Sequence, residues 1–176
     1  MINGCKLGLD VSTSCTGVVI LDCNGKFVLG AAFDFKNKNK FPNMFSKAQK
    51  IDSFLQEIKS NYPIDKITIE SALQMFRPGA SSATTISTLM KFNGIVSWLS
   101  YKVFGQEPEF LSAATARKVC GIKIPKGTKA KIAVMDHLIK NESQFIPFIK
   151  YTRTGSIAPH VYDIADAFVI AKASLT

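Results

Sequence analysis

The sequence predicts an α/β protein in which short apolar strands come first and amphipathic helices follow. Two apolar runs, 7–9 and 18–21, have the length of buried strands and are separated by small turn residues. Between residues 44 and 58, apolar residues recur at helical spacing instead. With 176 residues, 47% of them hydrophobic, the chain has the size of one compact domain, so we expect a single domain over residues 1–176.

The opening strands are predicted to form an antiparallel meander. Asn24-Gly25 is a dipeptide typical of a tight hairpin, and residues 26–35 supply a third apolar strand. A basic loop over 36–43 leads to the first helix, which Pro63 closes. A short alternating strand over 65–71 follows, and Glu70 lies at its end.

The rest of the chain is predicted to be mainly helical. A polar loop between Leu73 and Thr85 precedes a long helix whose apolar residues cover more than one face, so this helix is either central to the core or shared with a second subunit. A strand over 107–113 and a lysine-rich segment come next, with Thr128 as the expected cap of the following helix. The last helix is expected over 160–175.

Asp10 is the only charged residue between Leu7 and Leu21 and ends the first apolar strand. A carboxylate at the end of a buried strand needs a metal ion, a helix N-terminus or hydrogen bonds from a turn, because an unpaired buried charge is costly. One alternative is purely structural: Asp10 caps the turn through Ser12 and Thr13.

Three further acids accompany Asp10: Glu70 at a strand end, and Asp163 and Asp166 on the last helix. His160, Asp163 and Asp166 are spaced three residues apart, so neighbours in this series share a helical face near its start. The helix dipole alone would explain Asp163 but not Asp166. Four carboxylates suit Mg²⁺ or Mn²⁺, and two such ions about 4 Å apart can activate a water and stabilise the leaving oxygen during attack on a phosphodiester.

The charge balance indicates a polyanionic partner. Lys and Arg number 22 against 13 Asp and Glu, which gives a formal charge of +9 spread along the chain. Nucleic acid is favoured over a membrane, because no apolar run approaches the length of a bilayer span. The sequence shows no secretory signal, and a cytoplasmic location is expected, that of the host if a phage encodes the protein. An acidic site and a basic surface together indicate a nuclease.

The four cysteines are predicted to be free thiols. Cys5, Cys15, Cys23 and Cys120 form no CxxC pair, and no histidine stands at zinc-finger spacing from them. A structural zinc site is therefore not expected, and the thiols are expected to act as small apolar residues in a reducing compartment.

Five segments occur in a characteristic order: GLDVSTSCTGVVIL at 8–21, ITIE at 67–70, LMKFNG at 89–94, GIKIPKGTKAK at 121–131 and DIADAFVIA at 163–171. Together they resemble a Holliday-junction resolvase of the RuvC type, in the RNase H-like (retroviral-integrase) superfamily, over nearly the whole chain. This resemblance implies an RNase H-like fold, with a mixed five-stranded sheet whose first three strands are antiparallel and which α-helices flank. It also implies a homodimer that places two active sites on opposing strands of a four-way DNA junction.

The resemblance assigns roles to the acids. Asp10, Glu70, Asp163 and Asp166 match the acidic tetrad of the family, which implies a crossover junction endodeoxyribonuclease that makes paired nicks with two Mg²⁺ ions per site. Asp10 is expected to bridge both ions, Glu70 and Asp166 to complete one site each, and Asp163 to support the second ion or its water. Mn²⁺ is expected to substitute for Mg²⁺. His160 is either an auxiliary residue at the water or the scissile phosphate, or simply a helix-start residue.

The resemblance also implies DNA contacts. Lys123, Lys126, Lys129 and Lys131 are candidates for holding DNA, and the alternative for each is an ordinary solvated lysine. The loop after Glu70 is longer than in cellular bacterial relatives, and Leu73 stands where an aromatic wedge is expected. Phe76, supported by Arg77, is therefore the candidate wedge at the junction centre, with core packing as its alternative. The short, divergent chain suggests a bacteriophage or mobile-element version.

Other functions remain as alternatives. A related RNase H-like nuclease acting on flaps, forks or RNA would use the same tetrad, and a catalytically silent junction-binding protein would need the lysines but not the acids. The opening motif also resembles actin-like ATPases, which need two such domains and a second glycine-rich phosphate loop. The sequence specifies no branch-migration helicase as a partner.

Overall fold

A computed structural model describes residues 4–72 and 82–176. Its five-stranded sheet has the order β3-β2-β1-β4-β5. The strands are β1 (Cys5–Asp10), β2 (Cys15–Leu21), β3 (Phe27–Asp34), β4 (Ile64–Glu70) and β5 (Glu109–Leu111). β1, β2 and β3 pair antiparallel, whereas β4 pairs in parallel with both β1 and β5. The mixed sheet with three antiparallel opening strands is thus confirmed.

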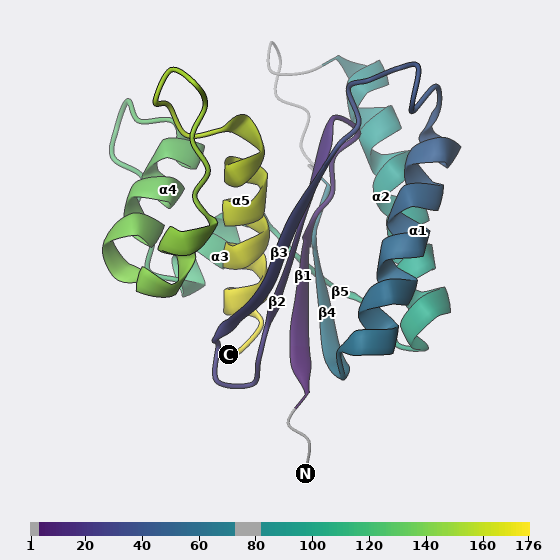
Figure 1. The fold of residues 1–176 in the computed structure, drawn as a ribbon, viewed down its shortest axis with the longest axis horizontal. Helices are drawn as coiled ribbons and strands as arrows, with labels where there is room; N and C mark the ends of the chain where they lie inside the picture. The colour runs from purple at the N-terminus through teal and green to yellow at the C-terminus, as the bar shows by residue number, and fades with distance from the viewer. Residues whose placement is uncertain (1–3, 73–81) are drawn as a thin grey trace.

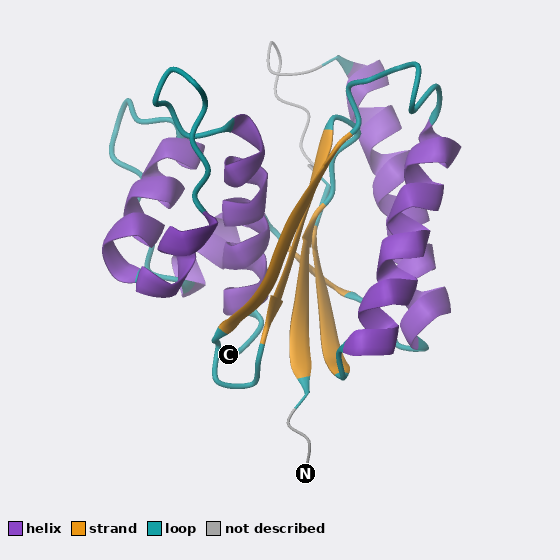
Figure 2. Ribbon diagram, viewed as in Figure 1, coloured by secondary structure: helices purple, strands orange, loops and turns teal. Residues whose placement is uncertain are grey.

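The helices cover the sheet in two layers (Figures 1 and 2). One face carries α1 (Met44–Asn61) and α2 (Ala83–Phe104), and the other carries α3 (Ala113–Val119), α4 (Ala130–Asn141) and α5 (Pro159–Ala173). A short 3₁₀ helix, η1 (Ser143–Phe148), connects α4 to the loop before α5. None of the helices in the described ranges is long and apolar enough to cross a membrane.

The buried strand β2 serves both layers because its side chains alternate between the two faces of the sheet. Val18 and Ile20 pack with α1 and α2, while Val19 and Leu21 pack with α4 and α5. All seven residues of β2 are buried. The continuous apolar run in the sequence therefore reflects a strand that is covered on both sides.

Two glycines let α5 lie directly on the sheet. A Cβ atom on Gly17 would lie 2.0 Å from the carbonyl oxygen of Asp163, and one on Gly8 would lie 2.6 Å from the carbonyl oxygen of Ala167. Any larger residue at either position would push the helix away, because these neighbours are backbone atoms. The two glycines thus fix α5 against β1 and β2.

Several sequence predictions are corrected. Thr128 does not cap α4: Lys129 holds the cap position and makes no side-chain cap hydrogen bond. The strand expected over 107–113 is only three residues long, and α3 follows it at once with Ser112 as its cap. α2 is not central to the core, since it buries one face and leaves Met90, Trp98 and Tyr101 exposed.

Other predictions are confirmed. The hairpin turns at Asn24-Gly25, where Gly25 has φ 78° and the Asp22 side chain accepts hydrogen bonds from the backbone of Asn24 and Lys26. α1 ends before Pro63, and its cap is Asn43. All four cysteines are free thiols, as predicted.

Candidate functional site

Asp10 and Glu70 reach the same edge of the sheet because they end adjacent parallel strands. The register of β1 and β4 pairs Leu9 with Ile69, and each acid is the next residue along its strand. Both side chains are half-buried. The backbone carbonyl of Glu70 accepts a hydrogen bond of 2.9 Å from the buried Asn93 amide on α2, which fixes the end of β4 against the helix layer.

α5 brings the other two acids to this edge from the opposite face of the sheet. Gly17 pairs with Asp10 across the hairpin, and the Asp163 backbone packs onto Gly17. Asp166 follows almost one helical turn later. Asp163 and Asp166 are the fifth and eighth residues of α5, and no acid lies in its first turn. The helix-dipole explanation is therefore wrong, and the close contact of α5 with the sheet places both acids.

Burial is the main cause of the raised pKa values of the four carboxylates, and neighbouring acids add to it at Asp10, Glu70 and Asp166. Burial, followed by the charges of Glu70, Asp166 and Asp163, raises the pKa of Asp10 well above its usual range. Burial and the Asp166 charge raise the pKa of Glu70 to about 7, although the Arg117 guanidinium opposes them. The pKa of Asp166 is raised to about 6, mainly by burial. The charge of Asp163 adds to this rise, whereas the charges of Arg117 and Lys131 oppose it.

Asp163 differs from the other three acids in having a thiol as a neighbour. Burial raises the pKa of Asp163, while hydrogen bonding with Cys15 and the charges of Lys36 and Lys131 oppose that rise. Burial and the hydrogen bond with Asp163 in turn raise the pKa of the Cys15 thiol. Cys15 is the buried first residue of β2, so this thiol stays protonated and can donate to the carboxylate.

The turn after β1 does not use the Asp10 carboxylate. The hydroxyl of Thr16 donates to the Ser12 carbonyl at 3.0 Å, and the backbone of Ser14 donates to the Ser12 hydroxyl at 3.3 Å. Within the described residues no hydrogen bond reaches the Asp10 side chain from Ser12 or Thr13. The turn-cap alternative therefore gives no account of this acid.

A hard cation fits the chemistry of this donor set. Arg117 and Lys131 are positive groups that act on Asp166, and burial nevertheless keeps the pKa of Asp166 above its usual range. Carboxylate oxygens are the ligands that Mg²⁺ and Mn²⁺ select. No group of three or more His, Cys, Asp or Glu side chains among the residues that the structure describes is arranged so that it could hold a metal ion.

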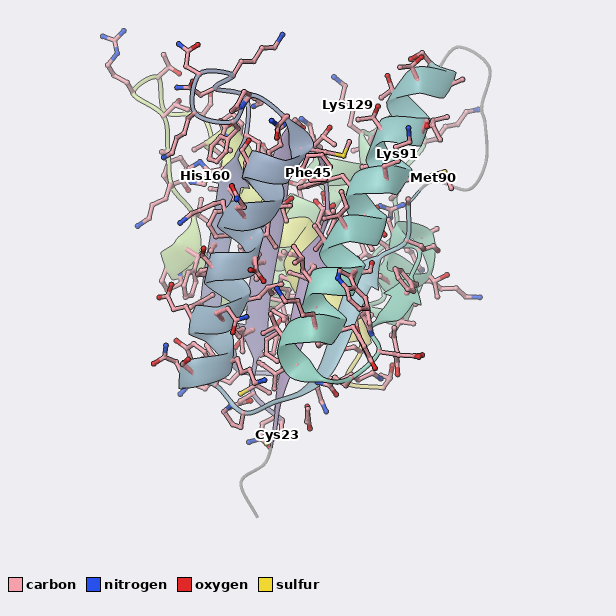
Figure 3. The ribbon with its side chains drawn as sticks, turned by 90° about the vertical axis from the view of Figure 1, so that its right-hand side faces the viewer. Cys23, Phe45, Met90, Lys91, Lys129 and His160 are labelled. Atoms are coloured by element: carbon pink, nitrogen blue, oxygen red, sulfur yellow. The ribbon has the colours of Figure 1, made fainter. Side chains whose placement is uncertain are left out.

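The predicted basic residues are distributed unevenly around the acids. The charge of Lys131 lowers the pKa of Asp163 and of Asp166. Its ammonium group lies 5.3 Å from the centre of the Tyr162 ring. Lys123, Lys126 and Lys129 are exposed. Figure 3 shows Lys129 and His160 in the half of the molecule opposite Cys23, which is the half that contains the ends of β1 and β4.

His160 is exposed in the first turn of α5, and no hydrogen bond or ion pair joins it to another described residue. The auxiliary role that the sequence allowed for His160 therefore stays a prediction. Phe76 and Arg77, the proposed wedge and its support, lie outside the described residues, as does Leu73.

Sequence reasoning missed Arg117, whose charge lowers the pKa of both Glu70 and Asp166. It lies on α3, which is seven residues long and was not predicted. The signal that could have found this helix is Ser112, a capping residue followed by an alanine-rich stretch. Cys15 was interpreted only as a small apolar residue, and nothing in its sequence context indicates the hydrogen bond with Asp163.

No protein-family model and no curated protein matches the sequence. Solved structures do. Thermus thermophilus RuvC is 12% identical, with a TM-score of 0.59 over 96% of this chain and 92% of that chain. T. thermophilus RuvC in complex with Holliday junction substrate is 10% identical, with a TM-score of 0.57 over 97% and 91%. The yeast mitochondrial Holliday junction resolvase Ydc2 is 15% identical, with a TM-score of 0.59 over 98% and 78%. The chain therefore has the fold of the RuvC-type Holliday junction resolvases, as its sequence motifs predict.

Proposed function

We propose that the protein is a metal-dependent endonuclease that resolves four-way DNA junctions by paired nicks. The observation that carries this proposal is the convergence of Asp10, Glu70, Asp163 and Asp166 at one end of the sheet. The shared fold with two resolvases supports it, and the complex of T. thermophilus RuvC with a Holliday junction supports branched DNA as the substrate here. The formal charge of +9 favours such a polyanion.

Four residues would hold Mg²⁺, with Mn²⁺ as a substitute. Asp10 would be central to the metal-binding group because the charges of the other three acids all raise its pKa, Glu70 from β4 and Asp163 and Asp166 from α5. When bound, the ions would supply an activated water and a stabilised leaving oxygen. The acids would release their protons to the solvent on binding the ions, since a metal-ligating carboxylate must be deprotonated. Arg117 would contact the phosphate, as a guanidinium matches its oxygens.

We also propose a homodimer formed through the exposed face of α2. Trp98 is 61% exposed, Met90 is 53% exposed and Tyr101 is 43% exposed. The Trp98 and Tyr101 rings lie 5.8 Å apart, so they form one apolar surface. Figure 3 shows Met90 and Lys91 in the half of α2 that lies toward the candidate site. Two sites in one dimer would match the two strands that must be cut in a four-way junction.

The decisive experiment is cleavage of synthetic four-way junctions by the wild type and by Asp10→Asn, in Mg²⁺ and in Mn²⁺. Linear duplex, flap, fork and RNA–DNA hybrid serve as competitors. The proposal expects paired symmetric nicks that Asp10→Asn abolishes while junction binding is kept or strengthened, because the substitution removes a negative charge next to DNA. Glu57→Gln, which changes an exposed acid of α1, is the matched control and should cut normally.

The other outcomes separate the alternatives. If flaps, forks or hybrids are cleaved in preference to junctions, the metal site stands but the protein is a nuclease with another substrate. Junction binding without metal-dependent cleavage of any substrate would leave a silent binding protein. Loss of binding in Asp10→Asn would contradict the assignment of this acid to the metal.

A further inference from the structure

A hollow of about 360 Å³ opens where α3 meets the segment 121–124. Its apolar surface comes from Ala114, Gly121, Ile122 and Ile124. Ile124 is 41% exposed, although it is a large apolar side chain in a lysine-rich segment. This surface is therefore open to solvent and available to a ligand.

Three cations surround the apolar surface. Arg117 and Lys118 come from the last turn of α3, and Lys123 comes from the segment after it. No ion pair in the described parts of the chain involves any of the three. Arg117 also connects the hollow to the carboxylates, because its charge acts on Glu70 and Asp166. A ligand in the hollow would therefore lie beside the candidate cleavage site.

A single nucleotide fits this combination of size, apolar surface and charge. The volume lies near the lower end of the roughly 300–1,000 Å³ typical of small-ligand sites. A nucleobase offers flat apolar faces, and its phosphate matches a guanidinium flanked by ammonium groups. A bare phosphate would leave the apolar surface of Ile124 and Ala114 unused. A base must leave its stack to enter such a site, which costs least where it is already unpaired, as at a branch point.

We propose that the hollow between α3 and 121–124 receives one unstacked nucleotide of the substrate strand next to the scissile phosphate. The base would lie on Ala114 and Ile124, and its phosphate would contact Arg117 and Lys118. This inference rests on the proposed function and extends it, because a nucleotide held here would make cleavage depend on the base beside the branch point.

A second hollow of equal volume adjoins the first and would receive the next part of the substrate DNA strand. It shares Gly121 and Lys123 with the first, and its other polar lining residues are Thr128, Asp136, His137, Lys140 and Asn141. Its character is more polar, which suits the sugar–phosphate chain that continues from the bound nucleotide.

The first test measures base unstacking without cleavage. Junctions that carry 2-aminopurine at single positions around the nick are bound to Asp10→Asn protein in Mg²⁺, and their fluorescence is recorded. We expect a rise at one position that Ile124→Asp, made in the same background, abolishes. Ile139→Asp is the matched control, because Ile139 is 40% exposed on α4 and does not line the hollow. A rise that survives Ile124→Asp, or the absence of any rise, would overturn the inference.

The second test blocks the hollow in the active protein. Ala114→Trp fills it from the exposed side of α3 and should slow junction cleavage by at least about tenfold. An abasic site at the unstacked position should remove this difference between variant and wild type. Equal cleavage of the normal junction by both would refute the inference, and Ile124→Asp replaces Ala114→Trp if that variant fails to fold. A wild type that binds junctions without cutting them would overturn the proposed function alone, since the fluorescence test would still decide the hollow.

Discussion

Replacing Glu70 by glutamine tests whether burial and a neighbouring carboxylate raise the pKa of Glu70 in the metal-free protein. The pKa of Glu70 is raised from 4.5 to about 7 by burial and by Asp166. The folded state therefore binds the proton more tightly than the unfolded chain does. Stability from this group is fully present below pH 4.5, declines as the pH rises and is lost above pH 7.

The magnitude follows from the size of that change. One pKa unit corresponds to about 1.4 kcal/mol, so ionising Glu70 costs the fold about 3 kcal/mol at pH 8, as an upper bound. Glutamine cannot ionise, and Glu70→Gln should raise the Tm at pH 8 by roughly 6–12 °C, while the two proteins should melt alike near pH 4.

Thermal unfolding followed by circular dichroism between pH 4 and pH 8, with and without Mg²⁺, measures this effect. Mg²⁺ should stabilise the wild type more than Glu70→Gln, because the ion supplies the missing counter-charge. Glu57→Gln controls for the general loss of one negative charge, since Glu57 is exposed on α1. If Glu70→Gln and Glu57→Gln have the same Tm at pH 8, burial and the Asp166 charge do not raise the pKa of Glu70 as the structure indicates.

Three further predictions concern stability, assembly and DNA binding. Gly17→Ala should lower the free energy of unfolding by about 1–3 kcal/mol, because the added Cβ atom would meet the backbone of α5. Gly94→Ala is the control and should not lower it, since a Cβ atom on Gly94 has no neighbour within 4 Å. Chemical denaturation measures both variants, and equal effects would contradict the close contact of α5 with the sheet. Trp98→Lys should convert a dimer into a monomer in size-exclusion chromatography with light scattering, and a monomeric wild type would refute the interface. Lys131→Ala should weaken junction binding and reduce its salt dependence by about one counterion, while Lys26→Ala, at the far hairpin, should change neither.

The sheet and the first half of the site could be predicted because they depend on local patterns. The apolar run of β2, the Asn24-Gly25 turn and the alternation before Glu70 each specify a strand or its end within a few residues. Asp10 and Glu70 then meet because parallel neighbours end at the same edge. The sequence does not place α5, since that depends on Gly17 and Gly8, whose role appears only when the helix lies upon them.

The basic side of the site was harder to predict because it depends on tertiary packing. The sequence indicates Lys131 only as one of four lysines that could hold DNA, and its electrostatic effect on Asp166 appears only in the folded structure. Arg117 was missed because α3 is short and buries only Ala116, so no apolar period indicates a helix. Lys129 has the cap position of α4 without a capping hydrogen bond, which is why the better capping residue, Thr128, misled the prediction.

The direct contact between α5 and the two glycines also orders events during synthesis. β1 and β4 leave the ribosome before α5 is made, so a nascent chain has Asp10 and Glu70 but neither of the later acids. Until α5 covers Gly8 and Gly17, one face of the sheet remains open, and contacts so distant in sequence form slowly. Under the proposed function, the set of metal-binding acids would therefore be complete only after α5 had packed on the sheet.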